Sequence, residues 1–307
     1  MATAFITHAV CALHDMGAHH PECPERLGAI NDRLIASGID AYLDFHDAPR
    51  AGDEHVLRAH SPDYLARLRE AVPQQGIHHL DPDTALNPHS LEAALRAAGA
   101  GVLATDLVVA RQADNAFCAV RPPGHHAGRG QAMGFCILNN VAIAALHALE
   151  AHGLERVAIV DFDVHHGNGT EEILRDDPRV MMASIFQHPF YPYSGTEGVP
   201  AHWANVPVKA GLRGTEFREV VDRRWLPALE AFAPGMIFIS AGFDAHYEDD
   251  MASCGLVEDD YAYATARLRE FAARQCGGRI VSMLEGGYAL SALGRAAVAH
   301  VRALADL

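Results

Sequence analysis

Basic residues are scarce in this 307-residue sequence, which has 24 Lys and Arg against 39 Asp and Glu and a formal net charge of −15. So large an acidic excess argues against nucleic-acid binding as the main activity, and its long-range field favours cationic ligands. The six cysteines include no CxxC pair. Scattered thiols of this kind are typical of a reducing compartment rather than of a disulfide framework, so we expect all six to be reduced.

Long apolar runs are also missing from the sequence. No run reaches the roughly 18 residues that a bilayer-spanning helix needs, so no membrane segment is expected. Residues 1–12 contain no Lys or Arg and include His8, and they therefore lack the basic start and uninterrupted apolar stretch of a secretory signal. A cytoplasmic location is the resulting expectation. Because there is no internal repeat and no Ser/Gly-rich linker, we expect a single domain over residues 1–307.

The sequence does contain a regular alternation of short apolar runs and helix-like segments. An Ala-rich helix is predicted over 90–111, where Gly99 and Gly101 would allow close packing. Strand-like runs follow at 116–120, 157–160, 180–186, 236–240 and 279–284, and helices are expected at 139–152, 170–175, 215–232, 258–275 and 290–305. Strands separated by helices predict a parallel sheet covered on both faces, with ligands outside the carboxyl ends of the strands.

Residues 157–170 carry the strongest chemical signal. An apolar run delivers Asp161, Asp163 and His165 at every second position, so an extended chain would project all three toward one face. Two carboxylates in an otherwise apolar run are costly to bury without a cation or hydrogen-bond donors. Carboxylate oxygens and an imidazole nitrogen suit a divalent cation such as zinc, so this segment predicts a metal site.

A third candidate ligand, Asp244, follows another strand-like run. Together with Asp163 and His165 it leaves a fourth coordination position open for water or substrate, as catalytic zinc sites require. The tandem pair His125 and His126 follows a Pro-Pro-Gly sequence. A turn there would aim both imidazoles at an attacking water, where a near-neutral pKa suits general acid–base catalysis.

These imidazoles need partners that orient them. Asp161 and Asn168 flank the metal motif and are available, Asp161 with the stronger effect because a carboxylate raises the basicity of the histidine that it holds. Tyr288 lies between Gly287 and Ala289 after a strand-like run. Its phenol would donate a hydrogen bond to a developing oxyanion opposite the metal.

Six motifs in this order resemble those of the histone deacetylase and acetylpolyamine amidohydrolase superfamily. They are HPECPERL at 20–27, RPPGHH at 121–126, GFC at 134–136, DFDVHHGNGT at 161–170, SAGFD at 240–244 and EGGY at 285–288. The first resembles the class II branch, which includes bacterial-type deacetylases. The resemblance covers nearly the whole chain. It implies the three-layer α/β arginase-deacetylase fold, with an eight-stranded parallel sheet and helices on both faces, and zinc-dependent removal of an acyl group from an amine.

Carried over residue by residue, the resemblance implies the following roles. Zinc would be held by Asp163, His165 and Asp244, and catalysis would rest on His125, His126 and Tyr288 with support from Asp161 and Asn168. A structural potassium ion would be held by Asp161, Ser184 and Ile185 with backbone oxygens of Asp163 and His165. Substrate would contact Gly134, Phe135, Tyr191, Asp83, Met251 and Gly286, and Arg26 would line a channel that releases acetate. Iron(II) is an alternative catalytic metal.

The resemblance also bears on the substrate. Family members that prefer polyamines often carry an acidic residue seven positions after the last zinc-binding Asp, and this chain has Met251 there. An apolar rim offers no ion pair to a distal ammonium group. An acyl-lysine peptide or a small acyl amide is therefore the favoured substrate. Acetylpolyamine hydrolysis stays the alternative, because Glu248, Asp249 and Asp250 lie in the same loop. The oligomeric state is left open, with a homodimer and a homotetramer as candidates.

Two other functions fit the same fold or the same residues. A binuclear manganese ureohydrolase would need further carboxylates to bridge a second ion, and His166 and Asn168 stand where an additional Asp would help. A catalytically inactive module that binds acyl groups is the other, and the intact ligands, tandem histidines and tyrosine argue against it.

Overall fold

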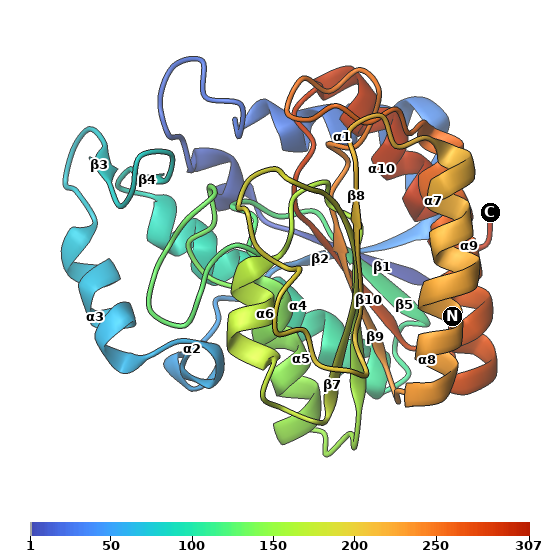
Figure 1. The fold of residues 1–307 in the computed structure, drawn as a ribbon. Coiled ribbons are helices and arrows are strands. Elements are labelled where there is room, and N and C mark those ends of the chain that lie inside the picture. Colours follow the sequence, from blue (N-terminus) through green and yellow to red (C-terminus); the bar gives the residue numbers. More distant parts are fainter. Residues whose placement is uncertain (1) are drawn as a thin grey trace.

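The computed structural model describes residues 2–307 and contains one eight-stranded sheet with helices on both faces (Figure 1). The strand order is β2-β1-β5-β10-β9-β6-β7-β8, and every neighbouring pair is parallel. The strands are β1 (Thr3–Thr7), β2 (Leu43–Asp47), β5 (Asn115–Cys118), β6 (Val157–Asp161), β7 (Val180–Gln187), β8 (Ala204–Val208), β9 (Ile237–Ala241) and β10 (Ile280–Leu284). The predicted fold is confirmed.

The helices form two layers (Figure 1). One layer holds α4 (Ser90–Val109), α5 (Asn140–Glu150) and α6 (Asn168–Leu174), and the other holds α1 (Glu25–Ser37), α7 (Gly214–Val220), α8 (Leu226–Phe232), α9 (Glu258–Gln275) and α10 (Leu290–Ala305). The remaining elements are α2 (Asp53–Ala59), α3 (Pro62–Ala71), the short helices η1 (Ala9–Leu13), η2 (Ile39–Tyr42) and η3 (Val221–Trp225), and an antiparallel hairpin of β3 (His78–His79) and β4 (Ala85–Leu86). The hairpin lies beside α3, away from the main sheet (Figure 1).

The central strands are buried along their whole length because helices cover both of their faces. Every residue of β6, β7, β9 and β10 is buried, which explains why these strands are continuous apolar runs rather than alternating ones. The edge strands β2 and β8 are partly exposed, and neither was predicted individually. β2 has a partner strand on one side only and is partly exposed, so its sequence LDFHD can contain polar as well as apolar residues.

Two glycines let α4 pack closely, as predicted. A Cβ atom at Gly99 would lie 1.9 Å from the carbonyl oxygen of Pro49, and one at Gly101 would lie 3.0 Å from the Cβ atom of Ala144 in α5. The first distance is far inside van der Waals contact, so only glycine fits there.

The helix predicted over 215–232 is interrupted. Between α7 and α8 the chain forms a π-helical turn, η3. Pro227 has no N–H to donate to the carbonyl four residues earlier, so a regular α-helix loses a hydrogen bond at this point. The wider turn places Trp225 in the core, where its Nε1 donates to the Ser184 carbonyl at 3.3 Å.

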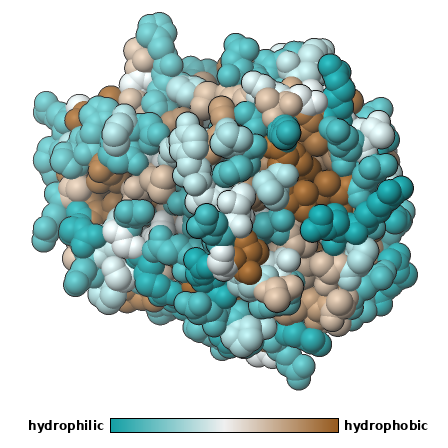
Figure 2. All heavy atoms as spheres, in the orientation of Figure 1, coloured by the Kyte–Doolittle hydropathy of each residue, from teal (hydrophilic) through white to brown (hydrophobic). Residues whose placement is uncertain are grey.

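The buried apolar side chains form one continuous cluster, and the face seen in Figure 2 is covered mostly by hydrophilic residues with small apolar areas between them. All six cysteines are free thiols in the described part of the chain. Among residues 2–307, no helix has both the length and the apolar character needed to cross a membrane.

Candidate active site

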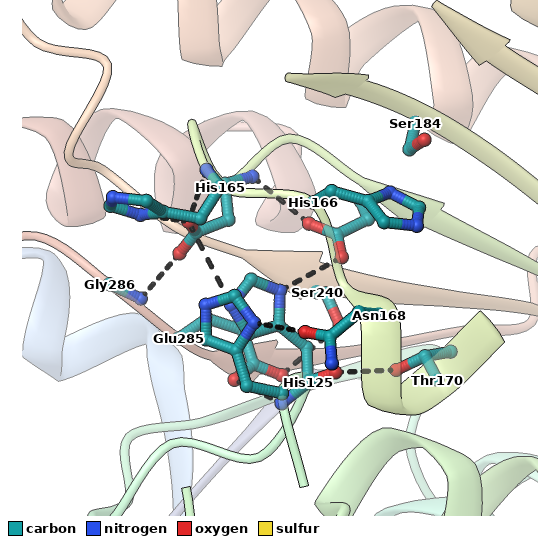
Figure 3. Close-up of polar contacts among 12 residues, drawn as sticks. His125, His165, His166, Asn168, Thr170, Ser184, Ser240, Glu285 and Gly286 are labelled. Atoms are coloured by element: carbon teal, nitrogen blue, oxygen red, sulfur yellow. Dashed lines mark hydrogen bonds and ion pairs between the residues drawn. The ribbon is translucent and has the colours of Figure 1, made fainter. Parts of the chain in front are cut away.

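Four neighbouring strands bring the predicted site residues together. In the order β5-β10-β9-β6 the strands are parallel, so the segments that follow them all emerge at one edge of the sheet. These segments carry the tandem histidines, the Gly-Gly-Tyr sequence, Asp244 and the DFDVHH sequence, although they are up to 160 residues apart in the chain. Figure 3 shows His125, His165 and Gly286, from three of these segments, close together.

Asp163, His165 and Asp244 form a compact group of potential ligands. Their ligand atoms all lie within 4.8 Å of one another. His165 Nδ1 lies 3.2 Å from Asp163 Oδ1 and 3.0 Å from Asp244 Oδ2, and all three side chains are buried. Burial, together with the neighbouring Asp163 carboxylate, raises the pKa of Asp244 to about 7. Two buried carboxylates facing one imidazole nitrogen fit a divalent cation such as zinc, which offsets their repulsion and desolvation.

Backbone groups and glycines hold the carboxylates in place. The Gly286 N–H donates to Asp163 Oδ2 at 2.8 Å, and the Val164 N–H donates to Asp244 Oδ1 at 3.0 Å. A Cβ atom at Gly286 would lie 2.3 Å from Asp244 Oδ2, and one at Gly242 would lie 2.1 Å from Asp163 Oδ2. Gly286, predicted to contact substrate, is therefore placed by the structure against both carboxylates.

The tandem histidines lie side by side, each with its own partner. Their ring centroids are 4.1 Å apart. His125 Nδ1 lies 3.0 Å from Asp161 Oδ2, and His126 Nδ1 lies 2.7 Å from Asn168 Oδ1 (Figure 3). These are the partners that the sequence suggested. An acceptor at Nδ1 leaves that nitrogen protonated and turns Nε2 toward the metal ligands, where His125 Nε2 lies 3.8 Å from an oxygen of Asp163.

The pKa values of the two imidazoles are shifted in opposite directions, and their partners differ in charge. Burial lowers the pKa of His125, but the Asp163 and Asp161 carboxylates outweigh it and raise the pKa to about 10. Burial lowers the pKa of His126 well below its usual value, and the positive charges of neighbouring histidines add to this effect. Environments that push two titratable groups apart in this way are typical of acid and base pairs.

Glu285 is a site residue that the sequence motif contained but to which no role was assigned. Its buried carboxylate accepts hydrogen bonds from the Gly124 N–H at 2.6 Å, the His125 N–H at 3.1 Å and the Ser240 hydroxyl at 3.1 Å. Burial raises its pKa to about 7. It thus joins the segments that follow β5 and β10 to β9 and fixes the turn that presents the histidines.

A narrow cavity of about 240 Å³ leads to this group of side chains. It is lined by Asp83, His126, Gly134, Phe135, His165, Phe190, Tyr191, Met251 and Tyr288. The residues predicted to contact substrate therefore lie around it, apart from Gly286, and Phe190 was missed. The Phe190 ring stacks on His165 with centroids 5.6 Å apart.

Tyr288 stands at the base of this cavity on a backbone held by an acidic residue. Asp249 Oδ2 accepts hydrogen bonds from the N–H groups of Tyr288 at 2.6 Å and Ala289 at 2.9 Å. Removal from bulk water raises the pKa of Tyr288 well above its usual value, so the hydroxyl keeps its proton. The Phe135 ring meets the Tyr288 ring edge-on at 5.7 Å. The sequence offered no signal for this role of Asp249 beyond its place in an acidic loop.

Asp83 reaches the cavity from the loop between β3 and β4. The Thr84 hydroxyl beside it accepts a hydrogen bond from the Phe135 N–H at 3.0 Å, which ties this loop to the cavity wall. Burial and the nearby Asp81 raise the pKa of Asp83. The structure therefore places Asp83 and Met251 in the lining of the same cavity.

Arg26 is buried beneath Tyr288, with its guanidinium carbon 5.0 Å from the ring centroid. Its N–H groups donate hydrogen bonds to protein oxygens. Nε donates to the Gly287 carbonyl at 2.7 Å, Nη2 to the Glu285 carbonyl at 2.5 Å and Nη1 to the Glu22 carboxylate at 2.9 Å. Glu22 also pairs with buried Arg121. Arg26 thus holds the loop that carries Tyr288, and its role in an acetate channel stays a prediction.

The residues predicted to hold potassium lie on neighbouring strands, since Asp161 and Ser184 are paired in register between β6 and β7. The Ser184 hydroxyl donates to Asn205 Oδ1 at 3.0 Å, and Asp161 Oδ1 accepts from the Asp163 N–H at 3.1 Å. The register brings these groups onto neighbouring strands, and Figure 3 shows Ser184 set apart from His165. Potassium binding stays a prediction.

Comparisons with known proteins agree with this geometry. The sequence model of the histone deacetylase domain matches residues 20–304. A histone deacetylase-like amidohydrolase of Pseudomonas aeruginosa is 39% identical over 93% of this chain and 81% of its own, and a probable deacetylase of Archaeoglobus fulgidus is 36% identical over 94% and 82%. The crystal structure of the HDA15 HD domain superposes with a TM-score of 0.93 at 32% identity, covering 100% of this chain and 90% of that one.

Proposed function

We propose, because this chain belongs to the histone deacetylase family, that it is a zinc-dependent hydrolase that removes an acetyl or other short acyl group from the amine of an acyl-lysine side chain or a related acyl amide. One observation carries the proposal. Two histidines, each oriented by its own partner, face three potential metal ligands at the base of a narrow cavity. That arrangement suits attack of a polarised water on a bound amide.

A zinc ion held by Asp163, His165 and Asp244 would supply Lewis-acid polarisation of the amide carbonyl and of the attacking water. The imidazole of His126, whose pKa burial lowers, accepts the water proton at Nε2. His125 keeps its own proton, and Asp161 stabilises that positive charge, since its carboxylate lies 3.0 Å from Nδ1. His126, held by the uncharged Asn168, returns a proton to the leaving amine.

The Tyr288 hydroxyl donates a hydrogen bond to the oxyanion that forms on the carbonyl oxygen when water attacks the carbonyl carbon. Its ring is fixed between Arg26 and Phe135, so the donor needs little reorganisation. We expect Tyr288→Phe to lower kcat by about 10²-fold while leaving the fold intact, because one oxyanion donor is worth about that much. Steady-state kinetics on an acetyl-lysine peptide measure this, and unchanged kcat would remove Tyr288 from the mechanism.

The cavity supports a long, slender substrate. Phe135, Phe190 and Tyr191 are among its walls and suit an aliphatic side chain, and Met251 lines it at the position where polyamine-preferring members of the family often carry an acidic residue. We therefore favour acyl-lysine over acetylpolyamine substrates. Asp83 at the same opening is positioned to accept hydrogen bonds from peptide N–H groups. A large kcat/KM advantage for acetylspermidine over an acetyl-lysine peptide would overturn this preference.

The metal proposal is tested by removing and restoring metal. Protein stripped with a chelator should lose hydrolysis of the acetyl-lysine peptide and regain it with one zinc ion per active site, with iron(II) compared in parallel. Asp244→Asn should lose both zinc at this site and activity. No hydrolysis with zinc restored would instead support an inactive acyl-binding module, and two manganese ions in the active site would support a ureohydrolase.

Further parts of the proposal concern the protein's surroundings. A structural potassium ion near Asp161 and Ser184, a cytoplasmic location, and a homodimer or homotetramer are each consistent with the sequence reasoning. Dependence of thermal stability on potassium over sodium, cell fractionation and sedimentation test them in turn. Nucleic acids and membranes are not among the partners that we propose.

A further inference from the structure

A second group of potential metal ligands lies on the opposite edge of the sheet from the active site. It consists of Asp106, His147 and His152. Asp106 is in the last turn of α4, His147 is in the last turn of α5, and His152 follows the end of α5. Helices that connect parallel strands run back from the carboxyl ends to the amino ends. The ends of α4 and α5 therefore point away from the catalytic edge.

The three side chains converge on one point. His147 Nε2 lies 2.7 Å and His152 Nε2 lies 2.6 Å from the same oxygen, Asp106 Oδ1, and all the potential ligand atoms lie within 4.8 Å of one another. The side chain of Asp106 is 47% exposed, whereas those of His147 and His152 are 8% and 24% exposed. The group thus has two well-anchored nitrogen donors and one oxygen donor, and solvent can reach it to supply a fourth ligand.

The two packed helices fix this arrangement in advance. The rings of His147 and His152 meet edge-on at 5.1 Å, and His147 also packs against the His55 ring of α2 at 5.3 Å.

Arg58 carries a positive charge that opposes a cation at this site. Its Nη1 donates to His147 Nδ1 at 3.0 Å, which keeps the imidazole proton on Nε2 and directed at Asp106. Metal binding at Nε2 moves that proton to Nδ1, so the Arg58 Nη1 must withdraw. The displaced guanidinium group would still have an ion-pair partner in Glu150, because the Arg58 Nε already lies 3.2 Å from Glu150 Oε2.

We propose that Asp106, His147 and His152 bind a second divalent transition-metal ion at the ends of α4 and α5, in competition with Arg58. Two imidazoles and one carboxylate with an open position suit zinc, and also copper(II) or nickel(II), whereas calcium and magnesium prefer all-oxygen sites. The ion crosslinks α4 to α5 on the side of the sheet remote from the catalytic cavity.

Zinc itself is the probe. Wild-type protein and the Asp106→Ala/His152→Ala double variant are dialysed to equilibrium against the same free zinc, and bound metal is measured by atomic absorption. We expect the double variant to hold about one zinc ion fewer per chain and to hydrolyse the acetyl-lysine peptide at the wild-type rate. The difference between the two proteins reports this site whether or not the active site is filled. Equal zinc content would overturn the proposal.

A matched control is the His46–Asp44 pair, where His46 Nε2 lies 3.0 Å from Asp44 Oδ2 on the surface without a second histidine. His46→Ala should leave the zinc content unchanged, and a loss of zinc there would show that any exposed His–Asp pair binds it. Arg58→Met removes the competing positive charge and keeps the aliphatic stem. It should tighten zinc binding at the second site by about tenfold, and unchanged or weaker binding would contradict the competition.

Discussion

At the scale of single residues, Asp249 has the most consequence for catalysis without touching the reacting atoms. It accepts the N–H groups of Tyr288 and Ala289. We expect Asp249→Ala to lower kcat by about tenfold, because residues that orient a catalytic group are typically worth 10- to 100-fold, and to change KM less. Steady-state kinetics on an acyl-lysine peptide separate the two parameters.

The neighbouring Asp250 gives the control for this prediction, since it is exposed in the same loop. Asp250→Ala changes the charge of the loop by the same amount and should leave kcat unchanged. If both variants lost activity equally, the effect of Asp249 would be one of loop charge rather than of positioning. A loss confined to KM in Asp249→Ala would equally argue against positioning of Tyr288.

The site residues differ in how far the sequence could predict them. Asp163 and His165 could be paired because they are only two residues apart, directly after β6. Glu285 could not be assigned a role from spacing, because it binds N–H groups 160 residues earlier in the chain. The partners of a buried carboxylate depend on which strands are neighbours, and that order is set only by tertiary packing.

At the scale of the secondary-structure elements, α4 depends on one glycine. Gly99→Ala would place a methyl group 1.9 Å from the Pro49 carbonyl oxygen, so we expect it to lower the free energy of unfolding by about 1–3 kcal/mol or more. Gly28 in α1 is the matched control, because a Cβ atom there would meet nothing within 4 Å. Gly28→Ala should raise stability by roughly 0.5–1 kcal/mol. Urea denaturation of both variants checks this, and equal effects would contradict the packing argument.

The elements that the sequence did not predict are those whose formation depends on neighbours. β2 and β8 pair with only one strand each, and their sequences carry Asp, His and Pro residues. A strand at the edge of a sheet needs no long apolar run, so periodicity gives a weak signal there. The π-helical turn η3 preserves an apolar helical pattern on both sides of Pro227, which explains why the segment was predicted as one continuous helix.

At the scale of the whole molecule, buried neutral histidines make stability depend on pH. Burial lowers the pKa of His60 from 6.5 to about 4 and that of His300 to about 3. The geometry leaves His60 no room for a second proton, since Nδ1 lies 2.9 Å from the Gly128 carbonyl oxygen and Nε2 accepts the Asn139 N–H at 2.9 Å.

The sign of the pH effect follows from these directions. Below pH 6.5 these two histidines bind protons in the unfolded chain but not in the folded one, so their contribution to stability is complete above pH 6.5 and is lost as the pH falls toward their folded-state pKa values. His60 alone should account for a loss on the order of 3 kcal/mol over that range. Thermal melts from pH 8 to pH 4 measure it, and His60→Gln should flatten the slope. The same slope in both proteins would contradict this assignment.

Glu22 extends the acid sensitivity to lower pH. Burial opposes its ionisation, but Arg121 and Arg26 outweigh burial and lower its pKa from 4.5 to about 2. Its stabilising contribution is therefore complete above pH 4.5 and disappears as the pH falls toward 2. Because Arg26 also holds the Glu285–Gly287 carbonyls, acid should disorder the active-site loop and the core together.

The position of β10 has a consequence for how the protein is made. It is the last strand of the chain, yet it lies between β5 and β9 in the middle of the sheet. Until residues 280–284 leave the ribosome, β1, β2 and β5 form one group and β6 to β9 another, and nothing joins them through hydrogen bonds of the sheet. The nascent chain therefore carries two open strand edges and a divided active site until β10 has been synthesised. A ribosome that stalls before residue 280 would release not a weakened enzyme but two half-sheets exposed to aggregation.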